Sequence, residues 1–289
     1  MGMLATAWTP MRAFAWCQSH NVAQSTPGVC QTEGVPLGWN RRCIGYGVDL
    51  RGTEGLDFEQ VKSIAIRAFR HWTSVDCGVG TVAFDIQPYA EPAFCSKAEF
   101  NRFGRNVNTL AFVTDWENRA SASGVPYDSN AIAITTTSST SSGEILDADI
   151  LINENFAPFA ECADSGCTGD DVFRIDLESI ITHEIGHFFG IAHSADPQST
   201  MWFDYGAGSI EPRSLSPDDE AALCGVYPPG IIQSTTCTLE PLGGLALDCE
   251  PKRLLGTCAL QRSRDTEPAW VLFALGSLVW MRTRRRRQR

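Results

Sequence analysis

Residues 182–194 read THEIGHFFGIAHS and hold three of the five histidines of this 289-residue chain. An α-helix turns once in about 3.6 residues, so His183 and His187 project from the same face, one turn apart. Glycine adopts left-handed backbone conformations without a Cβ penalty, so Gly190 can end the helix sharply and bring His193 back towards the other two. The spacing therefore predicts three imidazoles that converge on one point.

Such a group of imidazoles is typical of a zinc site. Three protein ligands, here His183, His187 and His193, leave the fourth tetrahedral position for water, as in catalytic zinc centres. Glu184 follows the first ligand directly and stays within reach of that water, where a general base is needed. An isolated HExxH recurs by chance in ordinary helices, which is the alternative interpretation. The longer pattern HExxHxxGxxH favours one catalytic Zn²⁺.

A methionine follows the third histidine in the stretch STMWFDYG, residues 199–206. A lone methionine usually fills a gap in a core. After this helix, Met201 instead predicts a turn that packs beneath the metal without touching substrate. Tyr205 has two interpretations: it lines the substrate pocket or steadies the oxyanion, or it is a structural tyrosine.

With these residues the sequence resembles the metzincin zinc metalloproteases, and among them the matrixin-like branch of the peptidase family M10 type. The extended histidine motif matches position by position, and Met201 matches the Met-turn. The resemblance extends from about residue 37 to about residue 229 and is most specific over residues 176–227. It implies an α+β, zincin-like domain with a twisted mixed sheet, an N-terminal amphipathic helix, the zinc-binding active-site helix and a C-terminal helix.

Hydrophobic periodicity places these elements along the chain. Apolar residues recur at intervals of three and four over residues 56–72, which predicts the amphipathic helix. Strands are expected at residues 42–50, 81–87, 107–115, 130–138 and 144–153. In the last of these, Asp147 and Asp149 alternate with apolar residues, which predicts a half-buried strand. The active-site helix is expected to begin near Asp176, and the closing helix at Ser216.

Eleven cysteines without a CxxC pair indicate a disulfide framework in an oxidising compartment, and hence an exported protein. Pairs of cysteines that are near in sequence are candidates, although the sequence does not fix the connectivity: Cys162 with Cys167, Cys77 with Cys95, and Cys237 with Cys249. Matrixins mask their zinc with a prosegment cysteine, but Cys43 lacks the surrounding motif and is predicted to form a disulfide. An odd number leaves one cysteine over, and Cys258 is the candidate.

Four regions are predicted along the chain. Residues 1–36 form an N-terminal extension, in which Ala5-Thr6-Ala7 resembles a signal-peptidase site and marks residues 1–7 as the remnant of an export signal. Residues 37–229 form the metalloprotease domain. Residues 230–262 form a cysteine-containing linker, and residues 263–289 form a tail.

The tail joins a short apolar segment to a cluster of arginines. The apolar segment, within residues 267–281, is shorter than the roughly 20 residues of a full transmembrane helix. The arginines after it would stay on the cytoplasmic side and leave the protease domain outside. The tail resembles the carboxy-terminal sorting tails of myxobacteria, which implies that it is cut near Cys258 and that the protein stays at the cell surface. Secretion after processing of the tail is the alternative.

Charge and composition restrict the partners and further metals. The net charge is −11, and without the six arginines of residues 282–289 the rest is six units more negative, which argues against nucleic acid. Only His20 and His71 lie outside the motif, so a second zinc site built from histidines is excluded by count. Residues 146–155 and 163–171 offer oxygen ligands for Ca²⁺, with solvated acidic faces as the alternative.

These observations predict an exported zinc endopeptidase acting on protein or peptide substrates, with Glu184 passing a proton from water to the leaving amine. The family resemblance implies that substrate lies extended along an edge strand, for which residues 130–138 are the candidate. The alternative is a catalytically weak or inactive surface binding module that retains the zinc scaffold, and the intact Glu184 argues against it. The sequence leaves the substrate specificity and the oligomeric state open.

Overall fold

The computed structural model describes residues 14–121, 123–168, 173–231 and 237–248. Its main sheet has the strand order β3-β2-β4-β6-β5. The strands are β2 (Cys43–Val48), β3 (Asp85–Pro88), β4 (Asn108–Val113), β5 (Ala133–Ser139) and β6 (Ile145–Asn153). The helices are α1 (Phe58–Thr73), α2 (Leu177–Phe188) and α3 (Pro217–Val226). Shorter elements are β1 (Cys17–Gln18), β7 (Phe159–Ala160), β8 (Ile175–Asp176), β9 (Ile191–Ala192) and the 3-10 turns Trp116–Asn118 and Glu211–Arg213.

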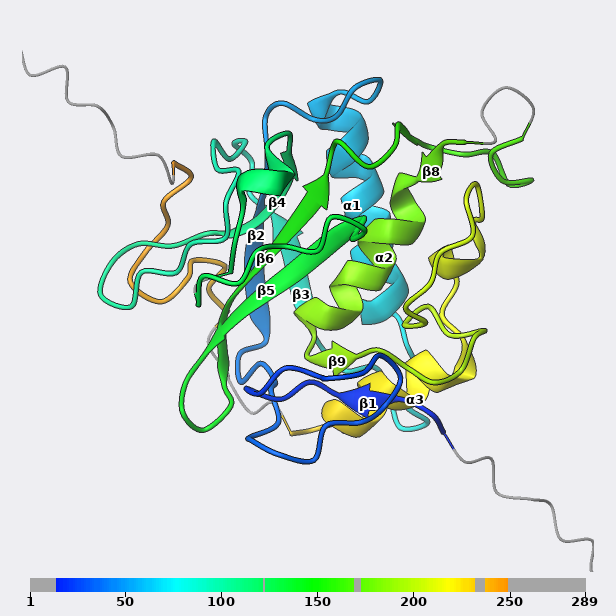
Figure 1. The fold of residues 1–289 in the computed structure, drawn as a ribbon. Helices are drawn as coiled ribbons and strands as arrows, with labels where there is room; N and C mark the ends of the chain where they lie inside the picture. Colours follow the sequence, from blue (N-terminus) through cyan, green and yellow to red (C-terminus); the bar gives the residue numbers. More distant parts are fainter. Residues whose placement is uncertain (1–13, 122, 169–172, 232–236, 249–289) are drawn as a thin grey trace, which may run out of the picture. The chain divides into compact units, whose positions relative to one another are not determined.

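The sheet is mixed, which confirms the expected α+β class. Strands β3, β2, β4 and β6 pair in parallel, and only β5 runs antiparallel to its neighbour β6. Strand β5 stands at one end of the strand order, so one of its edges has no partner within this sheet. Figure 1 shows the twist of the sheet and places α1 and α2 together on one of its faces.

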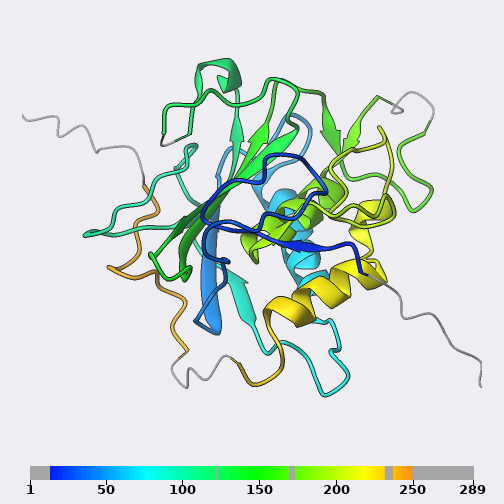
Figure 2. The ribbon, with the colours of Figure 1, turned by 60° about the horizontal axis from the view of Figure 1, so that its bottom comes forward.

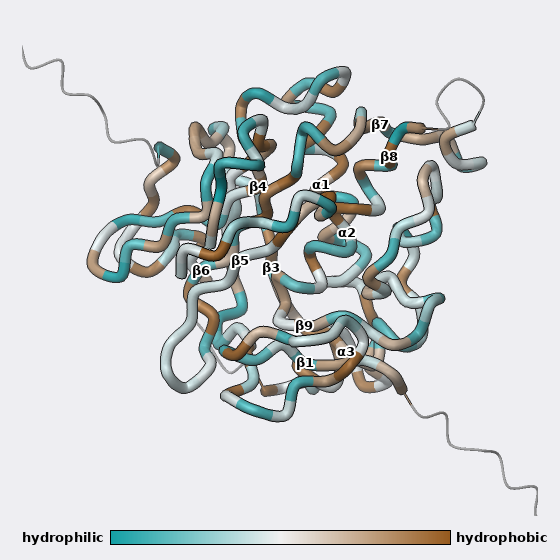
Figure 3. Tube along the Cα trace, in the orientation of Figure 1, coloured by the Kyte–Doolittle hydropathy of each residue, from teal (hydrophilic) through white to brown (hydrophobic). Residues whose placement is uncertain are grey.

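Helix α1 begins at a capping box and covers the sheet with one apolar stripe. The side chain of Asp57 accepts a hydrogen bond from the Gln60 amide, and the Gln60 side chain accepts one from the Asp57 amide. The buried residues are Val61, Ile64, Ala65, Ala68, Phe69 and Trp72. The Trp72 indole also donates to the backbone oxygen of Thr182 over 2.8 Å, which fixes α1 against α2. Figure 3 shows hydrophobic positions running through the central strands of the sheet.

Strand β6 is buried on both faces, so the prediction of a half-buried strand was wrong. Asp147 and Asp149 are only 1% and 2% exposed. The backbone amides of Thr109 and Glu99 donate to Asp149 over 2.8 and 3.0 Å. Burial raises the pKa of Asp149 to about 7, and burial beside Asp149 raises that of Asp147. Alternation of polar and apolar residues along a strand shows which residues share a face of the sheet. It does not show whether a loop covers the face that carries the polar residues.

Residues 237–248, the C-terminal segment, lie against strand β2 and the loop residues between β3 and β4. The Phe94 amide donates to Leu247 O over 2.8 Å, and the Asn106 amide donates to Gly244 O over 3.0 Å. In Figure 1 this segment is orange and runs beside the loop that contains these two residues.

The disulfides connect parts of the chain that are mostly far apart in sequence. The described bonds are Cys17–Cys30, Cys43–Cys237, Cys77–Cys224 and Cys162–Cys167. The local pair Cys162–Cys167 and the disulfide role of Cys43 are confirmed. The pairs Cys77–Cys95 and Cys237–Cys249 were wrong, because the fold brings Cys77 to α3 and Cys237 to the start of β2. Cys95 is disulfide-bonded as well.

Several predictions concern residues outside the described ranges. These are the signal remnant at 1–7, the unpaired Cys258 and the tail at 263–289. Among the residues that are described, no helix combines the length and the apolar character needed to cross a bilayer.

Candidate metal centre

Helix α2 is fixed at its start by a buried carboxylate. Asp176 is the N-cap, and its side chain accepts a hydrogen bond from the Ser179 amide over 2.9 Å. The guanidinium of Arg213 pairs with the same carboxylate, which is fully buried. The first turn of the helix is therefore held in place, and it sets the positions of His183 and His187, about two and three turns later.

The three histidines converge as the spacing predicts. Each of His183, His187 and His193 offers a ligand atom, and these atoms all lie within 4.8 Å of one another. The helix ends at a turn in which Gly190 has φ +78°, and a Cβ there would lie 2.7 Å from Leu37 O. Glycine is required at this turn, and strand β9 then carries the chain back to His193.

The outer ring nitrogens of the first two histidines are bonded to the backbone. His183 Nδ1 lies 2.7 Å from Thr200 O, and His187 Nδ1 lies 2.8 Å from Ile191 O. A carbonyl accepts only, so each Nδ1 carries the proton and each Nε2 keeps its lone pair for a metal. Burial and the imidazoles of His193 and His183 lower the pKa of His187, and burial together with His183 lowers the pKa of His193 to about 3. Neutral imidazoles of this kind fit Zn²⁺.

Glu184 is buried next to the histidines and has a partner that the sequence did not indicate. Its side chain is 4% exposed. The hydroxyl of Thr135, on β5, donates to Glu184 Oε2 over 2.7 Å. Burial raises the pKa of Glu184, while His183 and the Thr135 hydroxyl oppose that rise. The sequence pattern placed residue 135 on a strand but gave no signal that this strand meets the helix at Glu184.

Replacing Thr135 by valine is expected to lower kcat by about tenfold and to leave KM within about twofold, because one hydrogen bond to a charged group is lost. Thr135→Ser keeps the hydroxyl and is expected to retain most of the activity. Steady-state kinetics on a peptide substrate would measure both. Thr137→Val, two residues along β5, is the matched control, and an equal loss in that variant would contradict a specific role for Thr135.

Met201 packs under α2 and is held there by α3. Met201 is fully buried, and a Cβ at Gly186 would overlap its sulfur, so the helix needs glycine where the two meet. The buried carboxylate of Asp219 accepts hydrogen bonds from the amides of Thr200 and Met201 over 2.8 and 3.1 Å. It also accepts bonds from Ser199 and Ser216. One side chain thus fixes the turn, including the carbonyl that orients His183.

Tyr205 is held within the protein by its hydroxyl. This group donates to Ser209 O over 2.6 Å and accepts a hydrogen bond from the Asp176 amide over 3.0 Å. Burial raises its pKa to about 12. These bonds support the structural interpretation of Tyr205, and its contact with substrate stays a prediction.

A second group of potential metal ligands does not fit a metal. Cys43, Asp85 and Cys237 lie close together, but the two sulfurs form a disulfide and are not available as thiolates. Calcium binding stays a prediction.

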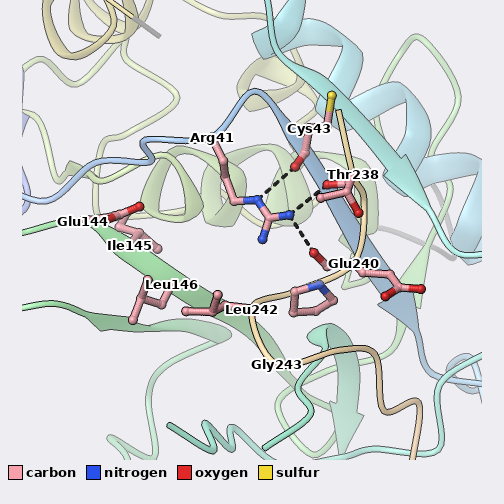
Figure 4. Close-up of a pocket in the computed structure, with 10 residues that line it drawn as sticks. Arg41, Cys43, Glu144, Ile145, Leu146, Thr238, Glu240, Leu242 and Gly243 are labelled. Carbon is pink, nitrogen blue, oxygen red and sulfur yellow. Dashed lines mark hydrogen bonds between the residues drawn. The ribbon is translucent and has the colours of Figure 1, made fainter. Parts of the chain in front are cut away.

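A cavity of about 420 Å³ lies apart from the histidines (Figure 4). The Arg41 guanidinium inside it donates to the backbone oxygens of Cys43, Thr238 and Glu240 over 3.2, 2.8 and 2.6 Å. Burial lowers the pKa of Arg41. These bonds are all to the protein backbone, so Arg41 holds the C-terminal segment in place.

Comparisons with known proteins agree with this geometry. The model of the matrixin family of M10 peptidases matches residues 38–228. A metalloendoproteinase of Arabidopsis thaliana, 1-MMP, is 27% identical over 203 residues, which are 66% of this chain and 44% of that protein. Matrilysin of Felis catus is 47% identical over 53 residues, 18% of this chain and 20% of matrilysin. Each match thus covers less than half of the relative.

Proposed function

This chain belongs to the matrixin family, and on that premise we propose that it is an exported zinc-dependent endopeptidase. The observation that carries the proposal is the convergence of three imidazoles beside a buried carboxylate. His183, His187 and His193 would hold the ion. The two relatives named above are a metalloendoproteinase and a matrilysin, which supports the same chemistry.

The residues around the ion have separate tasks in peptide hydrolysis. Zinc bound at such a site acts as a Lewis acid and makes water a nucleophile near neutral pH. Glu184 accepts the proton of the attacking water and delivers it to the leaving amine. Thr135 holds one oxygen of that carboxylate and leaves the other free for the proton. Met201 and Asp219 keep the turn beneath the site in one conformation.

The substrate is an extended peptide that pairs with the free edge of β5. An edge strand offers unpaired backbone groups, and a peptide that adds to it is held mainly by main-chain hydrogen bonds. Thr135 lies on this strand, so the edge that would bind substrate also carries the partner of Glu184. Export is supported by the disulfide framework, which persists in oxidising compartments.

Zinc analysis together with an assay on an unfolded protein substrate tests the proposal. The full chain is expected to contain one zinc ion and to cleave internal peptide bonds. Loss of cleavage on chelation and its return with added zinc would tie the activity to the metal. A chain with full zinc and no cleavage would instead indicate a binding module, and a chain that takes up no zinc would contradict the site itself.

A further inference from the structure

The residues before the family domain contact the turn that carries the third histidine. Strand β1 pairs antiparallel with β9, so that Cys17 lies opposite Ala192 and Gln18 opposite Ile191. The next amide, of Ser19, donates to Gly190 O over 2.8 Å. Figures 1 and 2 both show this blue N-terminal segment beside the end of α2. The stretch between the second and third ligands therefore forms a two-stranded sheet with residues outside the matched domain.

The same segment continues as a loop, residues 17–30, that is closed by the disulfide Cys17–Cys30 and reaches His193 itself. Gln24 Nε2 donates to Val29 O over 2.9 Å and also to His193 O over 3.4 Å. A Cβ at Gly28 would lie 3.1 Å from Ser194 O, so the loop backbone packs directly on the residue after the ligand. The disulfide Cys17–Cys30, the hydrogen bond of Gln24 and the close approach of Gly28 together hold loop 17–30 against this turn.

His193 depends on such support more than the other two ligands do. The rings of His183 and His187 are each oriented by a backbone carbonyl at Nδ1. Among the described residues, no hydrogen bond to a ring nitrogen of His193 is found, so no such bond orients this ring and the placement of its backbone matters more. That backbone is held from one side by the loop. From the other side, the Ser194 hydroxyl donates to Asp218 over 2.6 Å.

We propose that loop 17–30 is a clamp that positions His193 and so sets how long the bound metal is retained, with Gln24 as the positioning residue. This inference rests on the proposed function, because it takes the three histidines as zinc ligands. Groups that orient a metal ligand from behind typically change metal affinity by about 10- to 100-fold when they are removed. Loop 17–30, which lies outside the matched domain, would thus affect retention of the metal through the turn that carries His193.

The rate of zinc release from the full chain to a chromogenic chelator tests the clamp, at a temperature well below unfolding. The Cys17→Ser/Cys30→Ser variant is expected to release zinc about tenfold faster than the wild type, or more. The Gln24→Met variant keeps the length of the side chain but loses its hydrogen-bond donor, and it is expected to release zinc about threefold faster. Gln31→Met is the control for Gln24, because the side-chain amide of Gln31, just after loop 17–30, donates to Ala23 O and not to His193. Cys43→Ser/Cys237→Ser is the control for loss of a disulfide, because that bond lies away from the histidines.

The outcomes separate the clamp from the enzyme. Release at the wild-type rate from both the Cys17/Cys30 and Gln24 variants would overturn the clamp, as would equal acceleration in the two control variants. If the Cys17/Cys30 variant does not fold, the comparison of Gln24→Met with Gln31→Met decides. Because zinc release is measured without substrate, a wild type that holds zinc but cleaves nothing would refute the proposed activity and leave the clamp measurable. A wild type without zinc would refute both.

Discussion

Replacing Glu184 by glutamine is expected to lower kcat by about 10²- to 10⁴-fold while the protein keeps its zinc, because the general base is lost but the three imidazoles remain. The side chain is buried, and Thr135 holds one of its oxygens, so glutamine fits the same space. KM is expected to change little, since Glu184 acts in proton transfer and not in holding the peptide. Kinetics on one peptide, with zinc measured in the same samples, gives both quantities.

Glu220→Gln is a matched control, because Glu220 is an exposed carboxylate on α3. Its kcat is expected to equal that of the wild type. Turnover by Glu184→Gln at the wild-type rate would show that another group accepts the proton. A variant that loses its zinc would show that Glu184 supports the metal site rather than the chemistry.

Replacing Asp219 by alanine is expected to lower the free energy of unfolding by about 3 kcal/mol or more, because several buried donors lose their acceptor at once. Those donors include the amides of Thr200 and Met201. The same change frees the turn whose carbonyl orients His183, so zinc affinity is expected to fall by about 10- to 100-fold as well. Urea unfolding of the metal-free protein and competition with a chelator separate the two effects.

Asp219→Asn keeps the shape and one acceptor oxygen, and it is expected to be less destabilised than the alanine variant. Glu220→Ala, the neighbouring residue on the exposed side of α3, is expected to change stability by about 0.5 kcal/mol or less. An alanine variant at 219 as stable as Glu220→Ala would mean that the Met201 turn does not depend on this carboxylate.

The convergence of the three histidines could be predicted from the sequence because their geometry is local. His183 and His187 are separated by one helical turn, and the positive φ of Gly190 explains the return to His193. The side chains of the capping residues Asp176 and Ser216 accept hydrogen bonds from amides at most three residues later, so the sequence predicted them as well. In each case the interacting residues are only a few positions apart, so local backbone geometry sets the distance between them.

The contacts that support the candidate site could not be predicted, because they join distant residues. Thr135 meets Glu184 only when β5 has paired with β6. Asp219 meets the Met201 turn only when α3 has docked. The same reason explains the wrong disulfide predictions, in which nearness in sequence stood in for nearness in the fold. Cys77 and Cys224 are 147 positions apart and bonded.

The bond between Cys43 and Cys237 joins positions 194 residues apart and encloses nearly the whole matched domain. A single cut by any protease in a loop between these two cysteines would therefore release no fragment. The two pieces would migrate as one band on a denaturing gel until a thiol reagent separates them. A cut of this kind would thus stay hidden in size measurements made on the oxidised protein.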